Sequence, residues 1–175
     1  GDRFVIGWMG SPTTTPYLTG ILGSLERVAE ARPEVMLQSI GALPVNTDRL
    51  SIEQFDWSID TEVDQLGGFD IGLMPLPDDP WTRGKGGYKL LQYGAMGLPV
   101  VASPVGVNKS IVEDGITGFL AGSEEAWAEC ILRLVDDASL RARMGRAGRE
   151  RMLSHYSLAR SSRKLVQILR NESIG

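Results

Sequence analysis

The sequence predicts an α/β domain of three layers, in which a mostly parallel sheet of about six strands carries helices on both faces. Short apolar runs typical of buried strands alternate with longer segments in which apolar residues recur at helical spacing. This alternation favours a parallel sheet, because a helix then crosses one face between each strand and the next. Glycine accounts for 21 of the 175 residues, well above the usual ~7%, which indicates many tight turns.

The first part of the chain predicts a strand, a helix and a second strand. Residues 4–9 are a short apolar run that ends in a loop of small and hydroxyl side chains. Thr15 followed by Pro16 makes a favourable N-cap and first helical position, so we expect a helix from residue 16 to about residue 31. Residues 35–40 then predict the next strand.

The middle of the chain predicts three further elements. The alternation of Phe55, Trp57 and Ile59 indicates a half-buried strand. A short helix is expected over residues 62–66, and residues 70–74 are another apolar run typical of a strand. That run stops at a proline-rich loop.

The last part of the chain continues the alternation. The predicted elements are strands over residues 100–103 and 118–121, helices over residues 108–113, 139–153 and 157–171, and a helix that Ser123 caps and that carries apolar residues from Ala126 to Val135. Ligands of a parallel sheet bind beyond the carboxyl ends of its strands. We therefore expect the binding site among the loops at residues 10–15, 57–60, 75–87 and 104–109.

The stretch from Trp81 to Gly106 indicates what would bind there. A glycine-rich loop leads into a helix that begins near Gly86, where free backbone N–H groups and the positive end of the helix dipole favour an anion. Arg83, Lys85 and Lys89 add positive charge at the same place. Because cations oppose the dipole at a helix N-terminus unless an anion compensates, the pattern predicts a phosphate or diphosphate. The alternative is a solvated cationic first turn.

Residues 87–103 (GYKLLQYGAMGLPVVAS), followed by Val105-Gly106 and by residues 111–120 (IVEDGITGFL), resemble the signature of the GT-B retaining glycosyltransferases of group 1, or family 4. A weaker match extends from residue 4 to about residue 169. The resemblance implies that residues 1–175 are a single Rossmann-like domain, the C-terminal, nucleotide-sugar-binding half of such an enzyme. It also implies that the N-terminal acceptor domain is absent from this chain.

In that family, a sugar passes from a nucleoside diphosphate sugar to an acceptor with retention of anomeric configuration, usually without a bound metal. The resemblance therefore implies a nucleotide-sugar donor, no cofactor and no metal, and little activity from this domain alone. The protein would stabilise charge on the leaving diphosphate, with Arg83 and Lys89 as the catalytic candidates. The donor-binding candidates are Gly10, Ser11, Thr13, Thr14, Lys85, Gly86, Gly87, Tyr88 and Gln92. Lys85, Lys89 and Gln92 are four and three residues apart and therefore share one helix face.

The chain departs from the family pattern at two places. Members commonly have a glutamate before the glycine loop and a second one eight positions later, where this chain has Gly84 and Gln92. In the first loop, many members have a Gly-Arg pair and a nearby lysine, whereas here Ser11 follows Gly10 and threonines replace the cations. Two alternatives therefore stay open: a noncatalytic nucleotide-sugar-binding module, and a sugar-nucleotide epimerase of the same fold.

Several conspicuous residues are better explained by structure than by chemistry. We expect Trp8, Trp127 and Cys130 in apolar packing and His155 at the surface, and we favour packing over stacking on a base or sugar for Trp57 and Trp81. Asp78 and Asp79 are adjacent acids without further ligands, so they predict no metal site.

The net charge of −4 hides an uneven distribution, because nine of the 18 lysines and arginines lie between Arg141 and Arg170, where Glu150 is the only acid. Such a run is a solvated helix face, a membrane-surface patch or a docking face for another domain. Without interleaved aromatic residues it does not indicate nucleic acid. No run approaches the ~18 apolar residues of a membrane-spanning helix, and the single cysteine fits a reducing compartment. We expect a cytoplasmic protein that can be peripheral to the inner face of the membrane.

Overall fold

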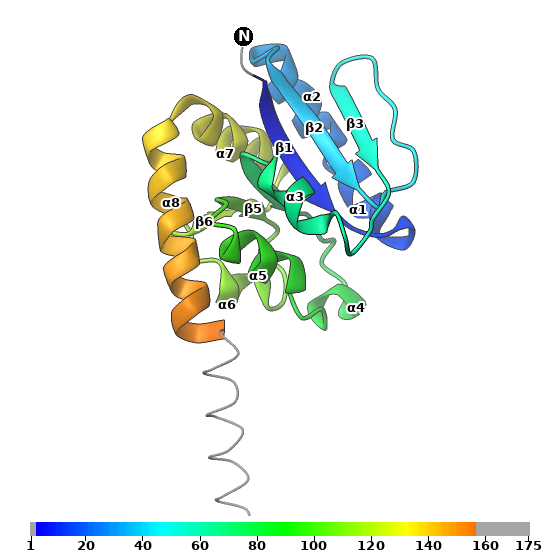
Figure 1. The fold of residues 1–175 in the computed structure, drawn as a ribbon. Coiled ribbons are helices and arrows are strands. Elements are labelled where there is room, and N and C mark those ends of the chain that lie inside the picture. The colour runs from blue at the N-terminus through cyan, green and yellow to red at the C-terminus, as the bar shows by residue number, and fades with distance from the viewer. Residues whose placement is uncertain (1–2, 157–175) are drawn as a thin grey trace, which may run out of the picture.

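The computed structural model describes residues 3–156. Within this range six strands form one sheet in the order β3-β2-β1-β4-β5-β6, and every neighbouring pair is parallel. The strands are β1 (Phe4–Met9), β2 (Val35–Ile40), β3 (Ser51–Phe55), β4 (Ile71–Met74), β5 (Val100–Ala102) and β6 (Gly118–Leu120). The predicted Rossmann-like α/β fold class is confirmed (Figure 1).

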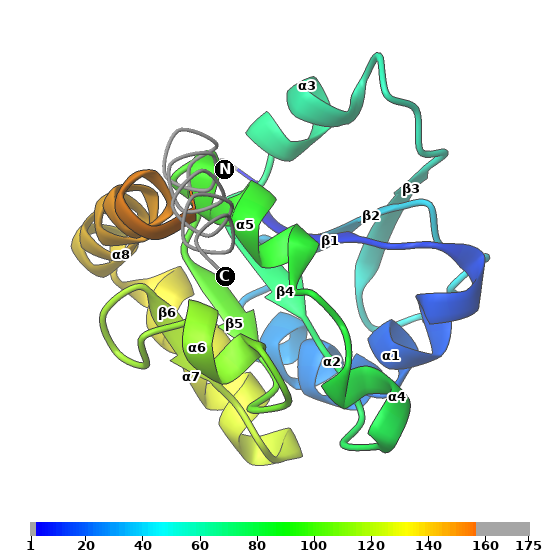
Figure 2. The same cartoon turned by 90° about the horizontal axis from the view of Figure 1, so that it is seen from below.

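Helices cover both faces of this sheet (Figure 2). Their bounds are η1 (Pro12–Thr14), α1 (Thr15–Thr19), α2 (Leu22–Ala31), α3 (Glu62–Gly67), α4 (Pro80–Arg83), α5 (Tyr88–Ala95), α6 (Asn108–Ile111), α7 (Glu124–Asp136), α8 (Ala138–Arg151) and a π-helical turn η2 (Met152–Tyr156). The α2 and α7 helices pack against each other on one face, and α3 and α5 lie on the other. The α8 helix contacts both α5 and α7, so it runs past the β6 end of the sheet.

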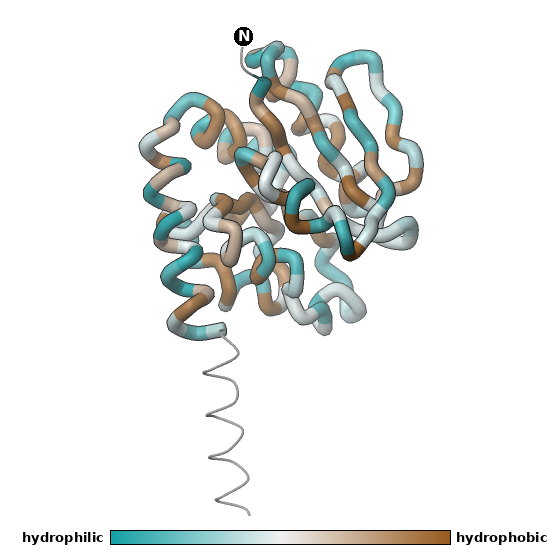
Figure 3. The backbone as a smooth tube through the Cα atoms, in the orientation of Figure 1, coloured by the Kyte–Doolittle hydropathy of each residue, from teal (hydrophilic) through white to brown (hydrophobic). Residues whose placement is uncertain are grey.

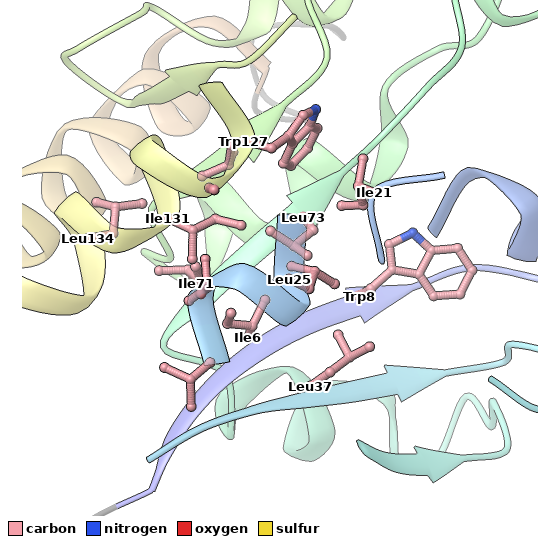
Figure 4. Packing of buried hydrophobic residues seen from close by; sticks show 14 of the residues in the cluster. Ile6, Trp8, Ile21, Leu25, Leu37, Ile71, Leu73, Trp127, Ile131 and Leu134 are labelled. Atoms are coloured by element: carbon pink, nitrogen blue, oxygen red, sulfur yellow. The ribbon is translucent and has the colours of Figure 1, made fainter. Parts of the chain in front are cut away.

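The first hydrophobic core lies between the sheet and the α2 and α7 helices (Figure 4). Successive side chains of a strand point to opposite faces, and Ile6 and Trp8 of β1 both point into this core. Trp127 of α7 is buried with them, and Cys130 packs partly buried at its edge. The predicted packing of Trp8, Trp127 and Cys130 is confirmed.

The second core lies on the opposite face, under α5. Met9 and Ile40, from β1 and β2, pack there with Leu90 and Tyr93 of α5. Apolar residues thus line the strands on both sides, while the outer faces of the helices are largely hydrophilic (Figure 3). In the part of the chain that the structure describes, no helix combines the length and the apolar character needed to cross a bilayer.

Tyr93 fixes α5 to the sheet. Its ring lies over Gly72 of β4, where a Cβ would come within 2.6 Å of the ring, so glycine is required for this close approach. The Tyr93 hydroxyl accepts a 3.0 Å hydrogen bond from the Met9 backbone N–H. Burial raises the pKa of Tyr93, so the phenol stays neutral. The second turn of α5 is thereby tied to the carboxyl end of β1.

The predicted helix over residues 16–31 was wrong as one continuous element. It is broken between α1 and α2 at Gly20 and Ile21, where the Ile21 N–H bonds the Leu18 carbonyl three residues back. Glycine costs about 1 kcal/mol relative to alanine inside a helix, so Gly20 favours the break, although Gly23 is kept inside α2. The predicted N-cap was also wrong, because the first turn begins after Ser11 and Thr15 is buried inside α1.

The predicted strand through Phe55, Trp57 and Ile59 was wrong in its position. The strand is β3, which ends at Phe55 opposite Ile40, the last residue of β2. The ladder with β2 ends at that pair, and Trp57 and Ile59 beyond it are 52% and 76% exposed. The alternation of apolar side chains here therefore reflects a surface loop.

Most other predicted elements agree with the structure within a few residues. The helix at the central stretch begins at Tyr88, two residues later than expected. The short α4 helix, within the predicted proline-rich loop, was not anticipated. The predicted helix over residues 157–171 lies outside the described residues.

Candidate functional site

A pocket of about 520 Å³ opens at the carboxyl edge of the sheet. It is built from the loops that follow β1, β2 and β3 and from the loop that leads into α5, with the end of β4 as its floor. The lining residues are Met9, Gly10, Ser11, Pro12, Gly41, Trp57, Glu62, Met74, Lys85, Gly86, Gly87, Tyr88, Lys89 and Gln92. Segments far apart in the sequence meet here because all strands of a parallel sheet end at the same edge.

One wall of the pocket is the N-terminal end of α5. Gly87 is its N-cap, with φ +66°, and a Cβ there would lie 2.4 Å from Ile111 Cδ1, so only glycine fits. The first backbone N–H groups of a helix have no partner inside it. Together with the positive end of the helix dipole, these groups favour an anion in the adjoining loop.

Lys85 and Lys89 bring two cations to this wall. Burial, and after it the charge of Lys85, lower the pKa of Lys89. The Lys85 ammonium lies 5.3 Å from the centre of the Tyr17 ring, a cation–π contact that leaves its charge without a counterion. Among the described residues neither lysine has an ion pair. An anion in the pocket would relieve the repulsion between them.

The opposite wall holds a carboxylate. Glu62, the first residue of α3, accepts hydrogen bonds from Gln92 Nε2 through one oxygen and from Trp57 Nε1 through the other. Gln92 Oε1 is buried and has no hydrogen-bond partner within residues 3–156. The pocket is therefore cationic at the α5 end and acidic at the α3 end.

Sequence reasoning missed Glu62 as a site residue. The available signal was its place directly after the loop at residues 57–60, which was predicted to lie at the ligand-binding edge. Trp57 is also in the pocket, half exposed, so the preference for simple packing was wrong there. It was wrong for Trp81 as well, which is 77% exposed on α4.

The structure brings most of the predicted site residues together. The ones that line the pocket are Gly10, Ser11, Lys85, Gly86, Gly87, Tyr88, Lys89 and Gln92. Thr13 and Thr14 do not line it, and Thr14 instead accepts a 2.9 Å hydrogen bond from the Ser11 N–H within the first turn. Arg83 is also outside the lining.

Arg83 and the two neighbouring acids form a local structure of their own. The Arg83 guanidinium donates to Asp78 at 2.7 Å, and this hydrogen bond lowers the pKa of Asp78. Asp79 caps α4 by accepting a 2.8 Å hydrogen bond from the Thr82 N–H. Across residues 3–156, no three His, Cys, Asp or Glu side chains converge as a metal site would require.

The chain is similar to proteins of one family. A family model described as glycosyl transferases group 1 matches residues 22–137, more than half of the chain. The GDP-mannose-dependent monoacylated alpha-(1-6)-phosphatidylinositol monomannoside mannosyltransferase of Corynebacterium glutamicum is 27% identical over 168 residues, which are 87% of this chain and 43% of that protein. The capsular polysaccharide biosynthesis glycosyltransferase CapM of Staphylococcus aureus is 27% identical over 171 residues, 89% of this chain and 43% of that protein. The chain thus spans less than half the length of these curated relatives.

Solved structures share the fold. The C-terminal domain of the group 1 glycosyl transferase LpcC from Francisella tularensis matches with a TM-score of 0.73 at 19% identity, over 90% of this chain and 88% of that one. Anabaena HepE, solved in complex with UDP and glucose, matches with a TM-score of 0.73 at 18% identity, over 97% of this chain and 48% of that one. Together with the family match, this fold shows that the chain belongs to the group 1 glycosyl transferases and corresponds to the C-terminal domain of their GT-B architecture.

Proposed function

We propose that this domain binds the nucleoside diphosphate sugar donor of a retaining glycosyltransferase. The observation that carries the proposal is the pair Lys85 and Lys89 at the glycine-capped N-terminus of α5, for which residues 3–156 provide no counterion. A diphosphate placed there would accept hydrogen bonds from the first N–H groups of α5 and neutralise both ammonium groups. Ser11 and the N–H groups of the first loop would face it from across the pocket.

The catalytic contribution of the domain would be electrostatic. When the bond to the sugar breaks, the leaving nucleoside diphosphate gains negative charge, and fixed cations and N–H groups stabilise that charge more than they stabilise the intact donor. Lys89 is placed for this role. Arg83 would share it only after exchanging Asp78 for a phosphate oxygen, because its guanidinium is engaged by that carboxylate.

The acceptor site belongs, in this proposal, to a partner domain. The curated relatives are more than twice as long as the matched part of this chain. Residues 1–175 would then form the donor domain alone, and transfer would need a separate acceptor domain. The domain by itself would bind donor with little turnover.

A noncatalytic nucleotide-sugar-binding module is the second candidate. Gly84, which stands where the family has its first glutamate, is exposed at the end of α4 and brings no carboxylate. The epimerase alternative has less support, because no histidine lines the pocket within the described residues. Turnover of a donor by the full-length protein, abolished in a Lys89→Ala variant, would favour the enzyme over the module.

The relatives differ in the donors that their names and structures carry. The Corynebacterium relative is named as GDP-mannose-dependent, and HepE was solved with UDP-glucose as well as with UDP. The base and the sugar of this chain's donor therefore stay open. The decisive experiment is a thermal-shift and calorimetric screen of the 175-residue protein with UDP, GDP, ADP, their sugars and pyrophosphate. A ligand that binds the folded state raises the melting temperature by mass action; no shift with any of them would refute the proposal.

We also propose a peripheral contact between this domain and an anionic membrane surface at the cytoplasmic side. The support is α8, on which Arg143, Arg146 and Arg149 are exposed at a spacing of three residues. Residues three apart lie on one side of a helix. The rest of the basic run, beyond Tyr156, lies outside the described residues.

A further inference from the structure

Glu62 is a carboxylate with neutral partners only. Trp57 Nε1 and Gln92 Nε2 each donate to a different oxygen of Glu62, and within the described residues no lysine or arginine pairs with it. A carboxylate has about four acceptor positions over its two oxygens. Two donors held by separate elements therefore fix its orientation and leave acceptor capacity on both oxygens at the pocket wall.

Gln92 carries a second unused acceptor at the same place. Its Nε2 faces Glu62, which assigns the amide orientation, because the reverse orientation would set Gln92 Oε1 against a carboxylate oxygen. In this orientation Oε1 is buried without a partner among residues 3–156. Buried polar atoms are normally hydrogen-bonded. A ligand that brings several hydroxyl donors would satisfy Gln92 and Glu62 together.

The chemistry of a donor fixes which of its parts reaches this wall. Its diphosphate belongs at the cationic end, between the α5 N-terminus and the loop after β1, and the acidic Glu62 repels it from the α3 end. The anomeric carbon must stay accessible to an acceptor that comes from outside the domain. A nucleoside bound in this way would extend in the other direction, over Gly41 and Trp57 towards Glu62, which line the same pocket.

We propose that Glu62 binds the vicinal 2′- and 3′-hydroxyl groups of the donor ribose, with Gln92 Oε1 accepting a further hydrogen bond, and that this contact selects ribonucleotides over 2′-deoxyribonucleotides. The inference rests on the proposed donor-binding function. Two neighbouring hydroxyls match the two oxygens of one carboxylate. When the 2′-hydroxyl is missing, acceptors at this wall stay unpaired. The 2′-deoxyribonucleotide therefore binds more weakly, because a polar group left without a partner costs free energy.

The competing explanation is that Glu62 only braces α3 against α5. A brace would affect every ligand of the pocket to the same degree, whereas a ribose contact would affect only nucleosides with a 2′-hydroxyl. The ratio of affinities for a ribonucleotide and its deoxy counterpart separates the two explanations. Pyrophosphate, which has no ribose, reports on the diphosphate site alone.

The test is calorimetry of the 175-residue protein with UDP and dUDP, GDP and dGDP, and pyrophosphate. For the base that binds, we expect the wild type to prefer the ribonucleotide at least about tenfold. Glu62→Gln should bring that preference below about threefold and leave pyrophosphate affinity within about twofold of wild type. Asp64→Asn is the matched control, because it removes one exposed carboxylate from the same helix and should change neither ratio.

Each outcome decides between the two claims. Equal affinity of the wild type for ribonucleotides and deoxyribonucleotides overturns the ribose contact and leaves the donor-binding proposal unaffected. This comparison uses the wild-type protein only, so it does not depend on whether a variant folds. If Glu62→Gln weakens the affinity for nucleotides and for pyrophosphate to the same degree, Glu62 only braces α3 against α5, and the proposed ribose contact is also overturned. Absence of binding to UDP, GDP, ADP, their sugars and pyrophosphate alike refutes the proposed function itself, and the ribose contact falls with it.

Discussion

Lys89, which we propose as an anion ligand, also lowers the stability of the fold. Its pKa is lowered by burial and by Lys85, so the folded protein disfavours the charged amine relative to the unfolded chain. This cost is fully present below the folded-state pKa, and it disappears as the pH rises towards the ordinary value of 10.5. The residue that we propose as a phosphate ligand thus makes the ligand-free domain less stable at neutral pH.

We predict that Lys89→Met stabilises the ligand-free domain at neutral pH, because methionine fills a similar volume without charge. Thermal unfolding should be measured from about pH 7 to about pH 10, and the advantage of the variant should shrink as the pH rises, since the wild type then sheds the proton that costs it stability. Lys109→Met, at an exposed lysine on α6, is the control and should change little. An advantage that does not vary with pH would contradict this account.

Arg83 and Lys89 are predicted to differ in how they reach a diphosphate. Lys89→Ala should weaken binding of UDP or pyrophosphate by about 1.5–3 kcal/mol, the scale of a hydrogen bond to a charged group. If Arg83 exchanges Asp78 for phosphate, Arg83→Ala should weaken binding on the same scale and Asp78→Asn should strengthen it by freeing the guanidinium. Calorimetry decides: unchanged affinity in Arg83→Ala, beside a loss in Lys89→Ala, removes Arg83 from the site.

At the scale of elements, the sequence predicted what local patterns encode. Strands with continuous apolar runs, such as β1 and β2, and the amphipathic α7 were found where expected, because burial on a known face leaves a period in the sequence. The α5 N-terminus was predicted from glycines and cations within about ten residues of each other. Both signals come from residues that are close together in the sequence, and the structures that they predict are formed by those same residues.

What could not be predicted depends on contacts between distant residues. Glu62 and Gln92 are 30 residues apart and meet only because the loop after β3 and the start of α5 share one edge of the sheet. The end of β3 at Phe55 depends on where β2 ends, which no pattern within β3 records. The pairing of Arg83 with Asp78 could not be predicted, because it depends on the conformation of the loop that carries Asp78.

Tyr93 links α5 to β1 through a hydrogen bond that the helical pattern of α5 does not reveal. In the sequence it is one apolar position of α5, yet its hydroxyl accepts the Met9 N–H from a residue 84 positions away. We predict that Tyr93→Phe destabilises the domain by about 1–3 kcal/mol, because a buried N–H loses its partner. Urea unfolding checks this, with Tyr88→Phe, an exposed tyrosine of the same helix, as the control that should stay within about 0.5 kcal/mol of wild type. Equal effects of the two changes would show that the Met9 hydrogen bond contributes nothing.

At the scale of the whole molecule, the arginines of α8 divide into two groups. Arg141 and Arg151 are used inside the domain, Arg141 on the Val135 carbonyl at 2.9 Å and Arg151 on the Ser110 carbonyl at 2.7 Å. The other three, Arg143, Arg146 and Arg149, are exposed. In a protein of net charge −4, this concentrates positive charge on one outer surface.

We predict that this surface binds anionic vesicles. Each arginine near the lipid contributes about 1 kcal/mol, so replacing Arg143, Arg146 and Arg149 together by Gln should reduce partitioning roughly a hundredfold. A second triple variant, Arg3, Arg32 and Arg49 to Gln, removes the same charge from other elements and should retain most of the binding. Vesicle sedimentation should rise with the anionic lipid fraction and fall with salt, because the attraction is screened within a Debye length. If both triple variants lose vesicle binding equally, the effect is due to net charge. If binding does not depend on the anionic lipid fraction, the exposed arginines of α8 are only a solvated helix face.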